Sequence, residues 1–391
     1  MAKPRSQVVL RKPLRATVAA GHPWIFRDAL QPFELPAGTV VTIVDPRGRF
    51  VGRGLVDDGP IGVRVWTADD EAVGPPLLAR RLAAAVALRR RVVPPETTAY
   101  RLVHGEGDRI PGVVCDIYGG FASVQLDGAA AQAWRPAILD ALREAVGELG
   151  IVGALVRTGK RGAKQVEHAW GEAPPETIEV QECGTTLTGS LLRGQKTGLF
   201  LDHRIGRSRV RELARGARVL DLYAYVGGFS ANAGRGGAAM VDTVDVAPEA
   251  IAAAGRTWAA NQLDAERQAR HVADVPEFLV AAAAERRRWD LIIADPPSFA
   301  PNEASKAAAL QSYTMLHAAC LRLLAPGGLL LAASCSSHVR AVEFEAALAQ
   351  GAAKAHGILQ VLERWGAPPD HPRLLAFPEG DYLKALLVRA G

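Results

Sequence analysis

The C-terminal half of the chain repeats one hydrophobic pattern, in which short apolar runs alternate with longer, alanine-rich segments of helical periodicity. Apolar runs of this length, separated by helices, are typical of parallel strands that are buried on both faces of a sheet. From Arg218 onward we therefore expect a parallel α/β sheet with helices on both faces. The runs are RVLDLYAY (218–225), MVDTVDV (240–246), WDLIIADPP (289–297) and GGLLLAASC (327–335), and ILQVLERW (358–365) and YLKALLVRA (382–390) are expected to add two strands, including an antiparallel one.

The first seventy residues have a different pattern, in which strand-length apolar bursts alternate with turns. The turn signal Asp45-Pro46-Arg47-Gly48 separates two such bursts, and IGVRVW (61–66) alternates with period two. This predicts a small β-rich domain that starts with the basic residues Arg11, Lys12 and Arg15. A purely structural β-barrel without a partner would show the same pattern.

Between these two regions the sequence predicts a compact α+β domain. A long helical pattern at 75–95 has proline pairs at both ends, which suit helix termini. A turn-rich stretch and two strand-like runs follow, and then an amphipathic helix at 133–149 and a strand at 153–158. The predicted domains are 1–71 (β-rich), 72–185 (α+β) and 186–391 (α/β).

Composition narrows the class of protein without naming a function. With 49% hydrophobic and 22% charged residues the chain is typical of a folded globular protein. We expect no membrane span, since no window reaches roughly 18 uninterrupted apolar residues, and no signal peptide, since no apolar segment follows the charged N-terminus. The net charge of +5 favours a polyanionic partner, although the many arginines also fit a GC-rich genome.

The four cysteines are too widely spaced to predict a zinc site or a disulfide framework. They are Cys115, Cys183, Cys320 and Cys335, and none belongs to a CxxC motif or a Cys/His pair. We therefore expect no metal and a reducing, cytoplasmic location.

In a doubly wound sheet, ligands bind outside the carboxyl ends of the strands, so the strand ends are the place to search for a site. The first strand ends in Val226-Gly227-Gly228-Phe229, whose glycines allow a tight turn and a close backbone approach, or serve structure alone. The second ends in Asp245, about twenty residues on, where an acid binds ribose hydroxyls or caps the next helix. Asp274 follows the third strand and fits two roles equally, adenine recognition or helix capping.

Two further strand ends carry residues with chemistry of their own. Asp295 is followed by Pro296, Pro297 and an aromatic residue, a pattern typical of methyltransferases that act on nucleobases. The acid or adjacent backbone would bind the polar edge of a base, and Phe299 would stack on the base or simply pack. Cys335 ends the fifth strand, next to the Asp295 strand in a standard winding, so its thiol is expected to face the same pocket. A structural Asp-Pro-Pro turn and an inert buried cysteine are the alternatives.

Six blocks in one order give the chain a specific resemblance that spans nearly its whole length. They are RLVHGEGDRIPGVVCD (101–116), GQKTGLFLDHR (194–204), VLDLYAYVGGFS (219–230), DPPSF (295–299), SCSS (334–337) and HPRLLAFPEGDYLKAL (371–386). Together they resemble the RlmI/RlmK-type large-subunit rRNA methyltransferases, which depend on S-adenosylmethionine. The resemblance implies an N-terminal PUA domain, a central α+β domain and a Rossmann-like methyltransferase domain. A PUA domain binds RNA, which would explain the basic β-rich start with His22-Pro23-Trp24.

The resemblance also assigns residues to an S-adenosylmethionine pocket and to RNA contacts. The implied cofactor-binding residues are Gln195, Lys196, Thr197, Asp221, Tyr223, Gly227, Gly228, Phe229, Asp245, Asp274, Asp295 and Pro296. The implied RNA contacts are Arg11, Lys12, Arg15, Arg204 and Phe299. Alternatively, Lys196 is simply a solvent-exposed basic residue.

Cys335 distinguishes two branches of this family. The branch that makes 5-methylcytosine resembles this chain in its SCS motif, whereas the branch that methylates guanine N7 lacks the cysteine. Catalysis by Cys335 and Asp295 is therefore implied, with the thiolate adding to carbon 6 of cytosine so that carbon 5 becomes nucleophilic. This chain departs from the family pattern at Val226, where threonine is usual, and at His203, where glutamine is commoner.

The leading expectation is a cytosine-5 methyltransferase that acts on 23S rRNA or a precursor of the large ribosomal subunit. Guanine-N7 or exocyclic-amine methylation would retain Asp295-Pro-Pro without requiring Cys335. A non-catalytic RNA-binding assembly factor would retain the fold without affinity for the cofactor. A small-molecule methyltransferase gives the N-terminal domain no role. The central domain fits either dimerisation or RNA binding, so a homodimer is left open, as is the base that removes the carbon-5 proton.

Overall fold

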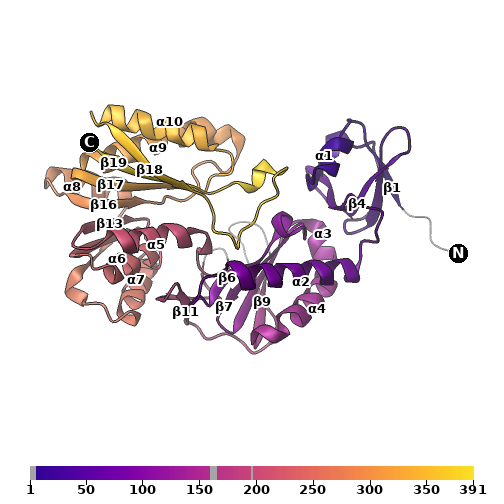
Figure 1. Ribbon diagram of the computed structural model, residues 1–391, viewed down its shortest axis with the longest axis horizontal. Coiled ribbons are helices and arrows are strands. Elements are labelled where there is room, and N and C mark those ends of the chain that lie inside the picture. The colour runs from indigo at the N-terminus through magenta and orange to yellow at the C-terminus, as the bar shows by residue number, and fades with distance from the viewer. Residues whose placement is uncertain (1–5, 159–164, 195–196) are drawn as a thin grey trace.

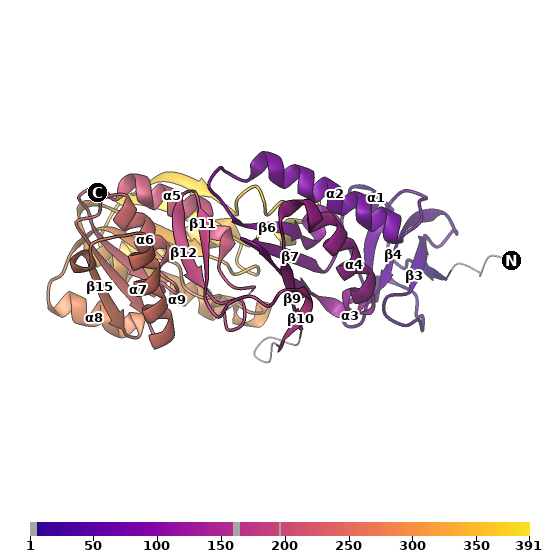
Figure 2. The same ribbon diagram turned by 90° about the horizontal axis from the view of Figure 1, so that it is seen from below.

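The computed structural model describes residues 6–158, 165–194 and 197–391. The chain forms three successive parts along one long axis, with the N-terminal strands at one end and the large C-terminal sheet at the other (Figures 1 and 2). This order agrees with the predicted sequence of a β-rich, an α+β and an α/β region.

The N-terminal part is a five-stranded sheet of order β1-β3-β4-β5-β2. Its strands are β1 (Gln7–Val9), β2 (Trp24–Phe26), β3 (Val40–Val44), β4 (Phe50–Val56) and β5 (Ile61–Thr67). Val41, Ile43 and Val63 are fully buried and form part of its core. The predicted β-rich character is therefore correct, although Arg15 opens a short helix that the pattern did not predict, α1 (Arg15–Ala19).

The central part is a five-stranded sheet of order β10-β9-β8-β7-β6, packed against helices. The elements are α2 (Pro75–Val92), β6 (Ala99–His104), β7 (Val113–Tyr118), β8 (Phe121–Leu126), α3 (Gly128–Ala133), α4 (Arg135–Val146), β9 (Gly153–Thr158) and β10 (Gln165–Gly171). The predicted strand-strand-helix-strand order is present as β7, β8, α4 and β9, and β6 and β10 extend the sheet at its two edges.

A β-hairpin joins the central and C-terminal parts, and the pattern did not predict it. Its strands are β11 (Ile178–Glu182) and β12 (Thr185–Gly189), so the predicted boundary at 185/186 falls inside β12. Thr188 bonds Thr257 of α7 (Pro248–Ala260), and the hairpin lies beside this helix in Figure 2. We therefore propose that the catalytic part begins before Ile178.

The C-terminal part is a seven-stranded sheet of order β15-β14-β13-β16-β17-β19-β18. Its elements are α5 (Arg204–Leu213), β13 (Arg218–Leu222), α6 (Gly228–Arg235), β14 (Met240–Asp245), α7, β15 (Gln268–Val272), α8 (Val275–Ala284), β16 (Trp289–Ala294), α9 (Lys306–Arg322), β17 (Leu324–Ser334), α10 (Ala341–Lys354), β18 (Leu359–Trp365) and β19 (Lys384–Ala390). Strands β13 to β17 are parallel, and β19 is antiparallel to both of its neighbours. The predicted doubly wound sheet and its antiparallel addition are thus confirmed.

Alternating side chains of the strands explain why helices cover both faces of this sheet. Leu220 and Leu222 belong to the core beneath α8, α9 and α10, whereas Val219 belongs to the core beneath α5, α6 and α7. Successive side chains of a strand point to opposite faces, so a continuous apolar run supplies both cores.

The segment 366–383, which connects β18 to β19, contacts all three parts of the chain and is the yellow loop that reaches toward the central part in Figure 1. Asp370 is fully buried and binds Arg204 through both carboxylate oxygens, and it accepts a hydrogen bond from the backbone N–H of Arg101. Phe377 packs edge-to-face on Trp24, with 4.6 Å between ring centroids. Trp24 of the His-Pro-Trp motif thus serves an internal contact in this structure.

Candidate active site

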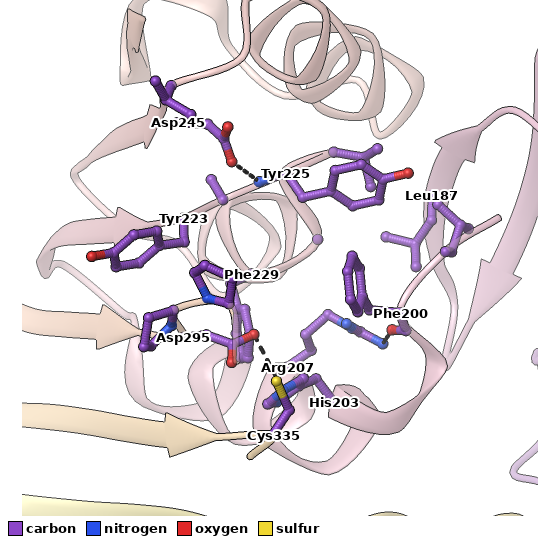
Figure 3. Close-up of a pocket in the computed structure, with 17 residues that line it drawn as sticks. Leu187, Phe200, His203, Arg207, Tyr223, Tyr225, Phe229, Asp245, Asp295 and Cys335 are labelled. Carbon is purple, nitrogen blue, oxygen red and sulfur yellow. Dashed lines mark hydrogen bonds and ion pairs between the residues drawn. The ribbon is translucent and has the colours of Figure 1, made fainter. Parts of the chain in front are cut away.

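A cavity of about 220 Å³ opens at the carboxyl ends of β13, β14, β16 and β17. It lies where the strand order turns back between β13 and β16, which is the expected ligand position in a doubly wound sheet. The structure brings seven of the predicted site residues together on its wall, and Figure 3 shows several of them converging. These are Tyr223, Gly228, Phe229, Asp245, Asp295, Pro296 and Cys335.

The turn after β13 has a backbone that brings peptide groups close to the cavity. Gly227 adopts a φ of 73°, and a Cβ atom there would lie 2.7 Å from the Cβ of Ala254. Tyr223 and Tyr225 also have positive φ, at 59° and 50°, which is uncommon for aromatic residues. Conformations of this kind persist where the surrounding structure imposes them, and they cluster at ligand sites.

Asp245 at the end of β14 is held by that turn. Its two carboxylate oxygens accept hydrogen bonds from the backbone N–H groups of Tyr225, at 2.8 Å, and Ala247, at 3.0 Å. Each oxygen retains acceptor capacity toward the cavity, because a carboxylate oxygen has two lone pairs. The ribose-binding role of Asp245 remains a prediction that this geometry accommodates.

Asp221 lies within the sheet and supports the first turn of α6. It is 1% exposed, and its carboxylate accepts hydrogen bonds from the backbone N–H and the hydroxyl of Ser230. Burial is the main reason why the pKa of Asp221 is raised to about 7; the hydrogen bonds from Ser230 oppose this rise, and the neighbouring Asp295 and Asp245 add to it. Asp221 therefore acts on the cavity through α6 rather than as part of its wall.

We expect Asp221→Asn to change how stability depends on pH. The raised pKa means that the folded protein binds a proton that the unfolded chain, with a pKa of about 3.9, releases. The wild type should thus lose stability as the pH rises from about 4 through 7, and asparagine does not titrate. Urea unfolding measures the free energy of unfolding of both proteins at pH 5 and pH 8. The value for the variant minus the value for the wild type should be roughly 2 kcal/mol higher at pH 8 than at pH 5. A difference that is the same at both pH values would contradict this.

The two loops that carry Asp295 and Cys335 are tied together by hydroxyl groups. The Ser298 and Ser336 hydroxyls lie 3.1 Å apart, and the Tyr313 hydroxyl is 2.9 Å from that of Ser334 and 3.0 Å from that of Ser336. These hydrogen bonds connect the two loops and thereby restrain the position of the acid relative to the thiol.

His203 and Arg207 add two basic side chains to this end of the cavity. His203 Nε2 lies 3.2 Å from Asp295 Oδ2, and Figure 3 shows His203, Asp295 and the Cys335 sulfur at the same side of the cavity. Arg207 is buried and binds both carboxylate oxygens of Glu182 in the hairpin. Burial opposes its charge, but Glu182 and the more distant Asp202 and Asp295 raise its pKa above the ordinary value.

Besides Asp221 and Gly227, four predicted cofactor residues lie away from the wall of the cavity or outside the described residues. Thr197 is buried and donates a hydrogen bond of 2.5 Å to Asp116 of the central part. Asp274 caps α8 by accepting from the backbone N–H of Glu277, which is the capping alternative. Asp274 also lines a second cavity, of about 760 Å³, together with Tyr223. Gln195 and Lys196 lie outside the described residues.

The structure contradicts one predicted RNA contact, that of Arg204. Its side chain is 3% exposed and both of its terminal nitrogens are bound to Asp370, so it is an internal ion pair with no surface to offer to RNA. Phe299 packs against Tyr313, at 4.9 Å between ring centroids, and lines the second cavity, which is the packing alternative.

The basic N-terminal residues are on the surface. Arg11, Lys12 and Arg15 are all exposed, and Lys12 forms an ion pair with Asp28. Their contact with RNA remains a prediction, since exposure and charge are necessary for phosphate binding but do not identify a partner.

Several residues on the wall of the cavity were not predicted as site residues. Phe200 and His203 lie in the GQKTGLFLDHR block, whose match to the family could have identified them. Arg207 and Leu187 gave no signal, because they reach the cavity through α5 and the hairpin. The wall thus combines two acids, a thiol, a histidine and an arginine with aromatic and aliphatic side chains.

Two absences concern the part of the chain that the structure describes. Among residues 6–158, 165–194 and 197–391, no helix combines the length and apolar character that crossing a membrane requires. The same residues contain no group of three or more His, Cys, Asp or Glu side chains that could hold a metal ion.

Comparison with known proteins gives two family matches. Residues 102–389 match the model of the S-adenosylmethionine-dependent methyltransferases, and residues 8–68 match that of the PUA-like domains. Ribosomal RNA large subunit methyltransferase I of Shewanella denitrificans is 34% identical over 379 residues, which cover 94% of this chain and 95% of the relative. Ribosomal RNA large subunit methyltransferase of Deinococcus radiodurans is 34% identical, over 99% of this chain and 98% of its own.

Solved structures share the fold over the whole chain. A SAM-dependent methyltransferase of Streptococcus mutans superposes with a TM-score of 0.87 at 23% identity, covering 98% of this chain and 100% of its own. A methyltransferase structure solved in complex with SAH gives a TM-score of 0.88 at 23% identity, covering 99% of this chain and 100% of its own.

Proposed function

The chain belongs to the S-adenosylmethionine-dependent methyltransferases, in the group that includes ribosomal RNA large subunit methyltransferase I, and on that premise we propose that it methylates carbon 5 of a cytosine in 23S rRNA. The observation that carries the proposal is the presence of Cys335 and Asp295 on the wall of one cavity, at the ends of adjacent strands. Methylation of cytosine at carbon 5 requires a thiol at this position, whereas methylation of a more nucleophilic atom does not require one.

The residues of the cavity fit S-adenosylmethionine, which supplies an electrophilic methyl group when bound. Gly228 lets the Arg207 side chain pack against the turn backbone, since a Cβ atom there would lie 3.0 Å from Cδ of Arg207. Asp245 offers carboxylate oxygens for ribose hydroxyls, and Val226, Val246 and Phe229 supply apolar wall. These side chains and the turn backbone would hold the cofactor.

Cys335 has a defined role in the proposed reaction. Carbon 5 of cytosine is a weak nucleophile, so the Cys335 thiolate adds to carbon 6 and forms a C–S bond while the ring electrons shift to carbon 5. After carbon 5 has been methylated, a base removes its remaining hydrogen as a proton. The electron pair of that C–H bond re-forms the C5–C6 double bond and expels the thiolate. The thiol must be ionised to begin this sequence, because the thiolate is the nucleophile.

Asp295 is proposed to bind the N3/N4 edge of the same base. A carboxylate accepts from the N4 amino group and stabilises a proton at N3, which favours electron flow out of the ring. His203, 3.2 Å from Asp295, orients the carboxylate from behind. The target base must leave its stack to reach this cavity, or already lie in a single-stranded loop.

The PUA-like domain gives the RNA substrate a second point of attachment in this proposal. Its exposed Arg11, Lys12 and Arg15 would neutralise phosphates, which makes binding dependent on salt. A large-subunit rRNA substrate accounts for this domain, and a free nucleotide or other small molecule does not. A cytoplasmic location and a homodimeric state both stay predictions.

Mapping the modified bases of 23S rRNA by mass spectrometry tests the proposal in a deletion strain. We expect one 5-methylcytosine to disappear, to return with the wild-type gene and to stay absent with the Cys335→Ala gene. Restoration by Cys335→Ala would exclude the covalent route. Loss of a methylguanine in place of methylcytosine would assign the enzyme to the other branch, and an unchanged modification map would remove the rRNA assignment.

A further inference from the structure

Lys384 is a buried lysine directly beneath the loop that carries Cys335. It is the first residue of β19, paired with Ser334 of β17, and the residue is 7% exposed. Its Nζ donates hydrogen bonds to the carbonyl oxygen of Ser336, at 2.6 Å, and to that of Tyr382, at 2.8 Å. Ser336 follows Cys335 in the chain, so the ammonium group is bonded to the backbone of the same loop.

Resting on the proposed function, we propose that Lys384 is a positioning residue that places a positive charge beside Cys335 and stabilises its thiolate. A buried cation is costly unless a counter-charge compensates it. In the part of the chain that the structure describes, no carboxylate lies within ion-pair distance of Lys384, whose hydrogen bonds are to carbonyl oxygens. The Cys335 thiolate, formed before attack and again on release, supplies the missing negative charge.

The titration of Lys384 agrees with this geometry. Burial is the main reason why the pKa of Lys384 is lowered to about 8, and the interaction with a Cys335 thiolate is the largest of the effects that oppose this lowering. A pKa of about 8 leaves the amine mostly protonated at pH 7, so the charge is present where the reaction runs. The interaction is mutual, because two coupled groups favour each other's charged form by the same free energy.

Other charged and titratable groups face the thiol from the surrounding elements. Asp295 opposes the thiolate from the end of β16, whereas His203 and Arg207 contribute basic groups at the same end of the cavity. Glu343 of α10 and Asp381 interact with Lys384 at longer range. Tyr313 interacts with Cys335 from α9, but burial raises the pKa of its hydroxyl, so it is neutral at pH 7. The Lys384 cation is therefore the group that approaches the thiol loop from β19.

If Lys384 had only a structural role, it would hold the loop in place through its hydrogen bonds and would not affect ionisation of the Cys335 thiol. Lys384→Arg retains the charge and the donors, whereas Lys384→Met retains the length of the side chain and removes both. Lys384→Gln retains a donor amide without the charge. Comparing the three separates electrostatic stabilisation from loop closure.

The test measures the alkylation rate of Cys335 by iodoacetamide as a function of pH, on the full-length protein without RNA, by mass spectrometry of the Cys335 peptide. We expect the midpoint to rise by about one to two pH units in Lys384→Met and Lys384→Gln, and by much less in Lys384→Arg. Lys354→Met, at an exposed position on α10, is the control and should match the wild type. Thermal melting and S-adenosylmethionine binding verify that each variant is folded.

Turnover gives a second, independent readout. In Lys384→Met, kcat at pH 7 should fall while KM for RNA is kept, and raising the pH should recover much of the loss. An unchanged alkylation midpoint in a folded Lys384→Met protein would overturn the proposal, even if kcat fell. Full methylation by Cys335→Ala would instead overturn the proposed function, and the alkylation result would then stand as a property of the thiol alone.

Discussion

Cys335→Ala is expected to abolish methylation of 23S rRNA, with a loss on the order of 10⁴-fold or more in the rate of a single turnover. Without the thiolate, carbon 5 of cytosine is too weak a nucleophile to take the methyl group. Binding of S-adenosylmethionine should be unchanged, because the turn after β13 and Asp245, which would hold the cofactor, do not depend on the thiol. Calorimetric titration with the cofactor measures this second expectation.

Substituting 5-fluorocytosine at the target position of an rRNA fragment makes the covalent step visible. Fluorine at carbon 5 cannot leave as a proton would, so the enzyme stays bonded through sulfur to carbon 6. The wild type should migrate as a protein–RNA adduct on a denaturing gel, and Cys335→Ala should not. Cys183→Ala, at a half-buried cysteine outside the cavity, is the matched control and should form the adduct. Single-turnover methylation by Cys335→Ala at the wild-type rate would refute covalent catalysis.

The architecture of the C-terminal part could be predicted because each strand and helix is recognisable from the pattern of its own residues. Each buried strand is a continuous apolar run, as in Leu291 to Ala294, and each helix between strands is long enough to have a clear period. The hairpin β11–β12 could not be predicted in this way. Both of its strands are short, β12 consists largely of threonine, and the hairpin is stabilised by partners far along the chain, such as Thr257 for Thr188.

The same distinction separates the site residues that could be predicted from those that could not. Asp245, Asp295 and Cys335 follow strands directly, so their position at one edge of the sheet follows from topology. Lys384 is the first residue of its strand, and it reaches the site because β19 runs antiparallel to β17, which places the start of β19 beside the end of β17. Arg204 illustrates the reverse error, since its charge suggested RNA binding and its partner lies 166 residues away.

The segment 366–383 contacts all three parts of the chain, and it leads into the strand that begins at Lys384. Asp370 binds Arg204 of the catalytic part and the backbone of Arg101 in the central part. The same segment contacts the PUA-like domain through Phe377, and it is followed by Lys384, which is bonded to the loop that carries Cys335. We therefore expect a substitution of Asp370 to affect both the stability of the protein and the arrangement of its three parts.

Asp370→Ala is expected to lower the free energy of unfolding by about 3–5 kcal/mol, because it leaves the buried Arg204 guanidinium without its carboxylate. It also removes the acceptor for the Arg101 N–H and for His371. Burial disfavours the charge of Asp370, but His371 and Arg204 outweigh that effect and hold its pKa well below the ordinary value. The contribution of this carboxylate is thus complete above about pH 4 and is lost as the pH falls through the folded-state pKa.

Urea unfolding at pH 7 measures the loss, with Asp140→Ala on the exposed face of α4 as the control that should change stability by less than about 0.5 kcal/mol. Asp370→Asn should fall between the two, because an amide oxygen still accepts one hydrogen bond but carries no charge to pair with Arg204. The difference between Asp370→Ala and the wild type should narrow in acid, where the wild-type carboxylate takes up its proton. A loss below about 1 kcal/mol at pH 7 would mean that water or a neighbouring group satisfies Arg204, and the segment 366–383 would then not hold the three parts together through this ion pair.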